Sequence, residues 1–436
     1  MAEKFNPGFF LRSVLFSYVN RIVLLVLGLA YVLLVANTLG PKLFGVYSYV
    51  LDFFGTVLLV LGMETFSDVL RVFLPKNRSA EFVKKIAFMQ TGVALVIAAV
   101  VFWQGSFLSD FLAAGSGIPF EWVAVVVLGI PVSSLVYSVA VGNRQFGKLI
   151  MLSIVENASN VILALVLMQL MPDALLAVFM ARAVSLGLLG LAGAWLLTGS
   201  LTEAPPSGTI VAKYGFQSWQ TTLFKKIGDQ AILIYVGIFV SAAALGFFYL
   251  LKKISLYIIE IPINAANEAL LPFATGSGDL SFTEKLVSKN VKFYLVFSVL
   301  MALVLLLVTP ILVAILFPSY SGGIFLVPLF ALYYALSFDY PLGTFFRAVN
   351  KPKIQTVAFF YSAIASITVG YLLISRFLAE GLLLTMIFSR VLNIAVSVAF
   401  IRKSGYKIEF IPRKGDLVFF WELGISTVKK GIQKIR

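Results

Sequence analysis

The sequence has no cysteine and no histidine, and only 12% of its 436 residues are charged. The absence of cysteine and histidine excludes disulfides, cysteine or histidine metal ligands, and catalysis by a thiol or an imidazole. The low charge content excludes an ordinary soluble domain, because about 25% of the residues in such domains are charged. We therefore expect a protein embedded in a lipid bilayer, with no metal site, no cofactor and no catalytic residues.

Hydrophobic residues, by contrast, make up 60% of the chain, and the mean hydropathy is +0.98. A membrane-spanning helix needs about 20 mostly apolar residues, and Gly, Pro and Ser separate the apolar runs with turns. The sequence predicts an all-α fold with about twelve spanning helices, at 10–37, 44–70, 84–108, 119–141, 148–171, 173–198, 214–239, 243–272, 287–316, 322–348, 353–375 and 378–401.

The net charge of +14 indicates an orientation rather than nucleic-acid binding, because Lys and Arg lie in short segments between apolar runs. Cytoplasmic segments of membrane proteins are rich in Lys and Arg. With the N-terminus inside, nearly all basic loop residues fall on the cytoplasmic side, and the outer segments hold only Lys42 and Arg376. The sequence predicts a multi-pass protein of the cell membrane with both termini in the cytoplasm and no nucleic-acid partner.

Short strings recur about 200 residues apart and divide the chain into two halves. Residues 43–47 (LFGVY) match 244–248 (ALGFF), each with a glycine followed by an aromatic residue two positions on, and two further pairs of strings follow in the same order. Six helices in each half make parallel lobes with a cavity that can open to either side. The predicted parts are an N-terminal lobe (1–198), a cytoplasmic linker (199–213), a C-terminal lobe (214–401) and a basic amphipathic cytoplasmic tail (402–436).

Charged residues inside the predicted spans are the main functional signal, because each costs several kcal/mol in hydrocarbon and usually faces a cavity or a partner. Lys225 and Asp229 are four residues apart on one helix face, where they can neutralise each other. Arg21 and Arg182 have no acidic residue within four positions of the chain. An anionic substrate can supply their counter-ion, and Arg matches phosphate geometry well. The alternative for Arg21 is an acid on another helix, Glu156 or Glu268.

Polar residues at steps of three or four form stripes on three predicted helices. Such stripes either line a cavity or join helices to each other, and stripes in both halves favour a shared wet cavity. The stripes are Lys253, Tyr257, Glu260, Asn264 and Asn267; Ser153, Glu156, Asn157 and Asn160; and Met386, Arg390, Asn393 and Ser397.

Residues 36–48, ANTLGPKLFGVYS, resemble the signature at the start of the second helix in polysaccharide (O-antigen-type) flippases. Weaker similarities follow in order, at Asp229, at Gly246 with Lys252 and Lys253 after it, at 271–272 and at 347–353. That family belongs to a superfamily with the multidrug and toxic-compound extruders and the lipid II flippase. The resemblance implies two six-helix lobes around a central cavity.

The resemblance also implies a function: flipping of an oligosaccharide linked to a polyprenyl phosphate or diphosphate, for cell-surface polysaccharide biosynthesis. Expected partners are this substrate, membrane lipids, and a glycan polymerase or glycosyltransferases. By depth and charge, the candidates for substrate binding are Arg21, Arg182, Lys225, Lys252, Lys253, Arg390 and Asn264. The candidates for ion coupling are Glu156, Asp229 and Glu260.

Two other functions compete with flipping. An ion-coupled exporter of drugs or small amphiphiles would favour an acid-dominated cavity, and many multidrug extruders have an acid in the first helix, where this chain has Arg21. A membrane glycan polymerase or ligase would need a sizeable outer loop with Arg or His, and the predicted outer loops are short. The chain is therefore expected to be a transporter and not an enzyme.

Overall fold

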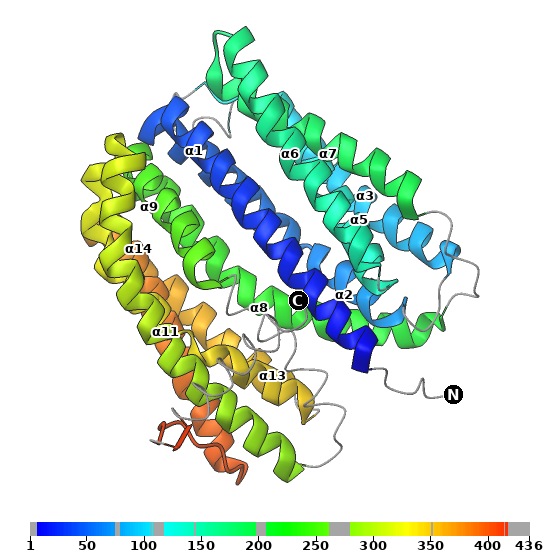
Figure 1. The fold of residues 1–436 in the computed structure, drawn as a ribbon, viewed down its shortest axis with the longest axis vertical. Helices are drawn as coiled ribbons and strands as arrows, with labels where there is room; N and C mark the ends of the chain where they lie inside the picture. Colours follow the sequence, from blue (N-terminus) through cyan, green and yellow to red (C-terminus); the bar gives the residue numbers. More distant parts are fainter. Residues whose placement is uncertain are drawn as a thin grey trace, which may run out of the picture.

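The computed structural model describes residues 7–74, 79–105, 107, 117–143, 145–197, 206–260, 280–349, 352–413 and 415–416. All regular structure in these residues is helical (Figure 1). The helices of the N-terminal half are α1 (Pro7–Val60), α2 (Met63–Phe73), α3 (Ala80–Trp103), α5 (Phe120–Gly142), α6 (Phe146–Leu170) and α7 (Ala174–Leu197). Those of the C-terminal half are α8 (Gly208–Phe239), α9 (Ala242–Ser255), the π-helical η2 (Leu256–Glu260), α11 (Leu280–Leu316), η3 (Pro318–Leu326), α12 (Val327–Ala335), η4 (Ser337–Asp339), α13 (Tyr340–Ala348) and α14 (Pro352–Lys403).

Within the described residues, nine helical segments are long and apolar enough to cross a membrane. Two of them contain two spans each, because α1 kinks at Gly40, with φ 66°, and α14 kinks at Leu378, with φ 51°. The charged helix α8 adds a further span, which agrees with the prediction of about twelve. The predicted all-α membrane fold is confirmed, and the chain is a multi-pass membrane protein.

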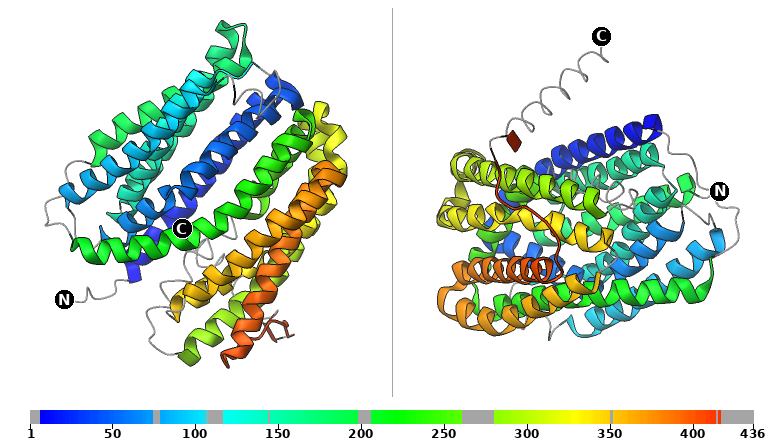
Figure 2. Two further views of the ribbon diagram at one scale, coloured as in Figure 1. Left: turned by 180° about the vertical axis from the view of Figure 1, so that it is seen from behind. Right: turned by 90° about the horizontal axis from the view of Figure 1, so that it is seen from below.

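The helices pack in two lobes that contact each other extensively, because α1 packs against α9 and α8, and α2 packs against α8. The first lobe consists of α1 to α7, with α6 against α7 and α3 against α5, and the second consists of α8 to α14, with α14 against α8 and α11 against α12. Figures 1 and 2 show α3, α5, α6 and α7 on one side of the pair of α1 and α9, and α11, α13 and α14 on the other, while α8 runs along the first lobe, against α1 and α2. The residue limits predicted for the lobes stay predictions. α8 begins at Gly208, earlier than predicted, and the predicted amphipathic part of the tail, 417–436, lies outside the described residues.

The lobes meet where the second part of α1, residues 41–60, packs along α9, a contact that we call the α1–α9 seam. A Cβ on Gly45 would collide with the carbonyl oxygen of Ala242, and a Cβ on Gly246 would collide with that of Pro41. These two glycines are the equivalent positions of the repeated strings. The repeat therefore marks the point where the two backbones approach most closely.

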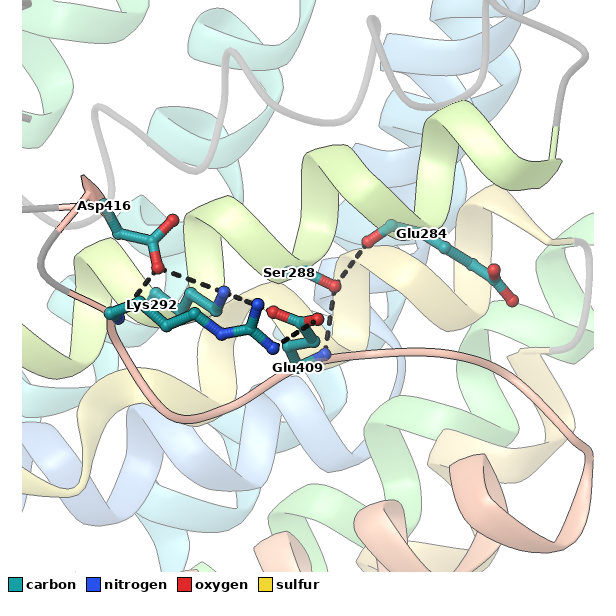
Figure 3. A network of polar contacts seen from close by, with 6 residues as sticks. Glu284, Ser288, Lys292, Glu409 and Asp416 are labelled. Carbon is teal, nitrogen blue, oxygen red and sulfur yellow. Dashed lines mark hydrogen bonds and ion pairs between the residues drawn. The ribbon is translucent and has the colours of Figure 1, made fainter. Parts of the chain in front are cut away.

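A strap formed by residues 404–413 and 415–416 crosses the end of the second lobe (Figure 3). Tyr406, Ile408 and Phe410 pack on the buried cluster formed by α11, α13 and the end of α14. Lys292 Nζ of α11 lies 2.6 Å from Glu409 Oε2 and 3.1 Å from Asp416 Oδ2. The strap thus joins three helices of the second lobe through apolar and ionic contacts.

We predict that Gly45→Ala or Gly246→Ala destabilises the protein, because the added methyl group must push two backbones apart. Overpacking of this kind typically costs about 1–3 kcal/mol. Thermal unfolding in detergent measures the effect. Gly55→Ala on the same helix is the control, since nothing lies within 4 Å of its added Cβ; equal unfolding midpoints for all three variants would contradict the close contact.

Strap docking should depend on pH. The hydrogen bond from Lys292 lowers the pKa of the Glu409 carboxyl, and the backbone N–H of Arg413 lowers the pKa of Asp416. The stabilisation by these carboxylates is complete above their ordinary pKa values of about 4.3 and 3.9, and it is lost as the pH falls through the lowered values.

Hydrogen–deuterium exchange of the strap amides, corrected for the intrinsic pH dependence of exchange, measures this docking. Lys292→Ala should accelerate exchange at neutral pH, and the exposed Lys285→Ala on the same helix should not. Equal exchange in the two variants would show that the apolar contacts alone hold the strap.

Candidate functional site: a charged cavity

A cavity of about 550 Å³ lies in the second lobe, where α8, α9, α12, α13 and α14 face the second part of α1. This volume falls within the range of about 300–1,000 Å³ that is typical of small-ligand sites. Its wall is strongly charged. The charged residues that line it are Asp52, Lys225, Lys226, Asp229, Lys252, Asp339 and Arg390.

Three ion pairs bridge neighbouring residues of the cavity wall. Lys252 Nζ lies 2.8 Å from Asp52 Oδ2, Lys226 Nζ lies 3.1 Å from Asp229 Oδ2, and Arg390 Nε lies 3.5 Å from Asp339 Oδ1. Lys225 is exposed and has no ion-pair or hydrogen-bond partner within the described part of the chain. The wall therefore offers one unneutralised cation and three that share their charge with carboxylates.

The α8 pair corrects one detail of the sequence analysis, which expected Asp229 to neutralise Lys225. Asp229 pairs instead with Lys226, three residues before it. Residues three and four apart are both neighbours on a helix surface, so spacing alone could not decide between the two lysines. Lys225 and Asp229 both line the cavity, as do the predicted site residues Lys252 and Arg390.

Arg390 is held from several directions. Its guanidinium donates to Tyr333 O at 2.9 Å and to Ser337 Oγ at 3.2 Å, and it lies 4.3 Å from the ring centre of Tyr333 and 5.4 Å from that of Tyr340. Together with the Asp339 pair, these contacts fix α14 against α12 and η4. All four residues of the predicted stripe on this helix, Met386, Arg390, Asn393 and Ser397, line the cavity.

The pair of Asp52 and Lys252 joins the two lobes, since Asp52 belongs to α1 and Lys252 to α9. Tyr249 Oη also donates to Asp52 Oδ2, at 3.2 Å, and Lys252 Nζ lies 5.4 Å from the ring centre of Tyr249. The sequence analysis gave Asp52 no role. One signal could have found it, because Asp52 and Lys252 each follow a repeated glycine by about two helical turns.

Arg182 and Glu156 lie away from the cavity and neutralise each other in the first lobe. Arg182 Nη2 lies 2.8 Å from Glu156 Oε1, and Tyr137 Oη donates to Glu156 Oε2 at 2.6 Å. The sequence analysis considered an acid on another helix as the partner of Arg21, and the structure instead places Glu156 against Arg182. The predicted roles of Arg182 in substrate binding and of Glu156 in ion coupling stay predictions.

The other predicted site residues also lie outside the cavity. Arg21 and the exposed Lys253 do not line it. The side chain of Glu260 and all of Asn264 fall outside the described residues, so their predicted roles are untested.

No family model matches the sequence. Over 206 residues the chain is 28% identical to the amylovoran biosynthesis protein AmsL of Erwinia amylovora. This match covers 46% of the chain and 52% of AmsL, so it spans about half the length of that curated relative.

Solved structures show the fold more completely. The chain aligns with an inward-facing MATE family transporter of the MOP superfamily at a TM-score of 0.69 and 12% identity, covering 90% of this chain and 98% of that one. For the lipid II flippase MurJ in an inward closed conformation, the TM-score is 0.70 at 13% identity, with 90% and 87% covered. For an outward-facing MATE transporter the TM-score is 0.64 at 14% identity, and the alignment covers 90% of this chain and 95% of the transporter. The chain therefore has the fold of the MOP superfamily, and the resemblance to this superfamily is confirmed at the level of the fold.

We predict that Arg182→Met destabilises the protein, because it leaves the Glu156 carboxylate buried without its counter-ion. Breaking a buried pair typically costs about 3–5 kcal/mol. The double variant Arg182→Met/Glu156→Gln should recover most of the loss in thermal unfolding. Arg376→Met, at an exposed position, is the control; a double variant no more stable than the single one would contradict the pairing.

Proposed function

We propose that this chain flips an oligosaccharide linked to a polyprenyl phosphate or diphosphate from the inner to the outer leaflet of the cell membrane, for cell-surface polysaccharide biosynthesis. The observation that supports this most directly is the cavity that gathers Lys225, Lys226 and Lys252 inside a MOP-superfamily fold. Cationic groups at such depth suit a phosphate-bearing substrate. The similarity to AmsL, named for amylovoran biosynthesis, and the fold shared with the lipid II flippase MurJ support the same conclusion.

In this proposal the phosphate groups bind Lys225 and Lys252, whose ammonium groups face the cavity. Asn393 and the hydroxyl groups of Tyr333 and Tyr340, on the same wall, are suited to contact sugars. The lipid tail stays in the bilayer, and movement of one lobe against the other transfers the headgroup. The TM-score is higher for the inward-facing MATE transporter than for the outward-facing one, which supports a cavity that opens to the cytoplasm. The distribution of Lys and Arg supports both termini on that side.

Arg21, Arg182, Lys253 and Asn264 remain proposed contacts of the headgroup on its way to or from the cavity. For ion coupling, Asp229 is the best-supported candidate because it lines the cavity and its side chain is 51% exposed. Glu156 and Glu260 remain candidates from sequence alone. A glycan polymerase and glycosyltransferases are proposed partners that supply and consume the substrate.

Ion-coupled export of drugs or small amphiphiles is the second candidate function. The specific observation in its favour is that Asp52, Asp229 and Asp339 also line the cavity. Flipping accounts better for the excess of cations on the same wall. We propose transport rather than glycan polymerisation or ligation, since the fold is shared with transporters.

We predict that Lys225→Ala lowers the flipping rate about tenfold, because a hydrogen bond to a charged group contributes about 1.5–3 kcal/mol. Arg21→Ala should abolish flipping at a normal protein level if the headgroup meets this residue. The measurement is translocation of a defined polyprenyl-diphosphate sugar in liposomes.

Lys213→Ala, on the same helix as Lys225 but exposed and outside the cavity, is the control. Wild-type protein that exports a cationic dye but leaves the polyprenyl-diphosphate sugar in place would favour the exporter function. Full flipping by Lys225→Ala would remove this lysine from the site.

A further inference from the structure

The ion pair of Asp52 and Lys252 belongs to two features at once. It lies on the α1–α9 seam, about two turns from the contact of Gly45 and Gly246, and both of its residues line the cavity. Their side chains are 33% and 38% exposed. A ligand in the cavity can therefore reach the group that joins the two lobes.

The other two ion pairs of the cavity wall each stay within the second lobe. Lys226 and Asp229 both belong to α8, while Arg390 of α14 pairs with Asp339 of η4. Among the cavity ion pairs in the described residues, only Asp52 with Lys252 crosses between the lobes. An anion that captures Lys226 or Arg390 leaves the seam intact, whereas one that captures Lys252 acts directly on it.

Uncharged side chains also resist opening of the seam. Phe44 and Val50 of α1 belong to the same buried apolar cluster as Phe248 of α9. Hydrogen bonds such as those from Tyr49 Oη to Leu233 O and from Tyr320 Oη to Ala36 O also link the lobes. They involve no cation, so a phosphate group has no charge there to compete for.

We propose that Asp52 is a positioning residue which holds Lys252, and with it the seam, until a phosphate group takes its place. This inference rests on the proposed function. In it, phosphate binding to Lys252 is the step that releases the lobes from each other. A partly exposed ion pair is weak, and a diphosphate offers Lys252 more negative charge than one carboxylate. The empty protein stays closed at the seam, and only the loaded protein opens there.

The absence of cysteine allows a direct test with two introduced spin labels. Lys42→Cys in the first lobe and Ser319→Cys in the second are exposed positions near the outer end of the seam. Farnesyl diphosphate serves as the probe, with farnesol as the control that lacks phosphate. Farnesyl diphosphate should shift the distance distribution toward longer separations, and farnesol should leave it unchanged.

Two variants separate this role from a purely structural one. Asp52→Asn should show the longer separation without ligand and bind farnesyl diphosphate several-fold more tightly, because the competing carboxylate is gone. Lys252→Met should also open the seam but bind several-fold more weakly. Asp339→Asn is the matched control, since it breaks an ion pair of the same cavity within the second lobe and should leave the separation unchanged.

The outcomes distinguish this inference from the function on which it rests. The release step would be wrong if farnesyl diphosphate bound without any change in separation. It would also be wrong if Asp52→Asn and Lys252→Met weakened binding equally. Either result would still be consistent with a phosphate site in the cavity. No binding to the wild-type protein would overturn both.

Discussion

A charged side chain inside a bilayer needs either a counter-ion or water, and this requirement organises the whole molecule. In the first lobe a counter-ion meets it: the Glu156 side chain, only 6% exposed, lies against Arg182 and Tyr137. In the second lobe carboxylates are the counter-ions of Lys226, Lys252 and Arg390, while Lys225 is exposed. Both lobes therefore meet the requirement by pairing charges, and in the second lobe these charges also line a cavity.

The sequence predicted the helices well because their determinants are local. Apolar runs of sufficient length and the turn residues between them place the spans, and the Leu-Gly-Pro string at 39–41 falls on the kink of α1. The stripe at 386–397 was also predictable, because residues three and four apart share a helix face whatever the neighbours are. Its lining of the cavity follows from the rotation of α14, which only the packed structure defines.

The pairing of charges between helices could not be predicted, because it depends on how each helix is rotated and tilted against others far away in the chain. Arg182 finds Glu156 on an adjacent helix, and Asp52 finds Lys252 two hundred positions away. The repeated glycines Gly45 and Gly246 were the one sequence signal for the pairing of Asp52 with Lys252. Close backbone approach at that point fixes the register of α1 against α9, and the register brings the two charges together.

The strap has a consequence for where the second lobe can bend. It ties α11, α13 and the end of α14 together through Lys292 and the apolar side chains beneath it. The helix α9 at the boundary with the first lobe continues into the π-helical turn of Leu256–Glu260. A π-helical turn interrupts the regular hydrogen-bond ladder, so we expect any bending of the second lobe there rather than in the helices that the strap joins.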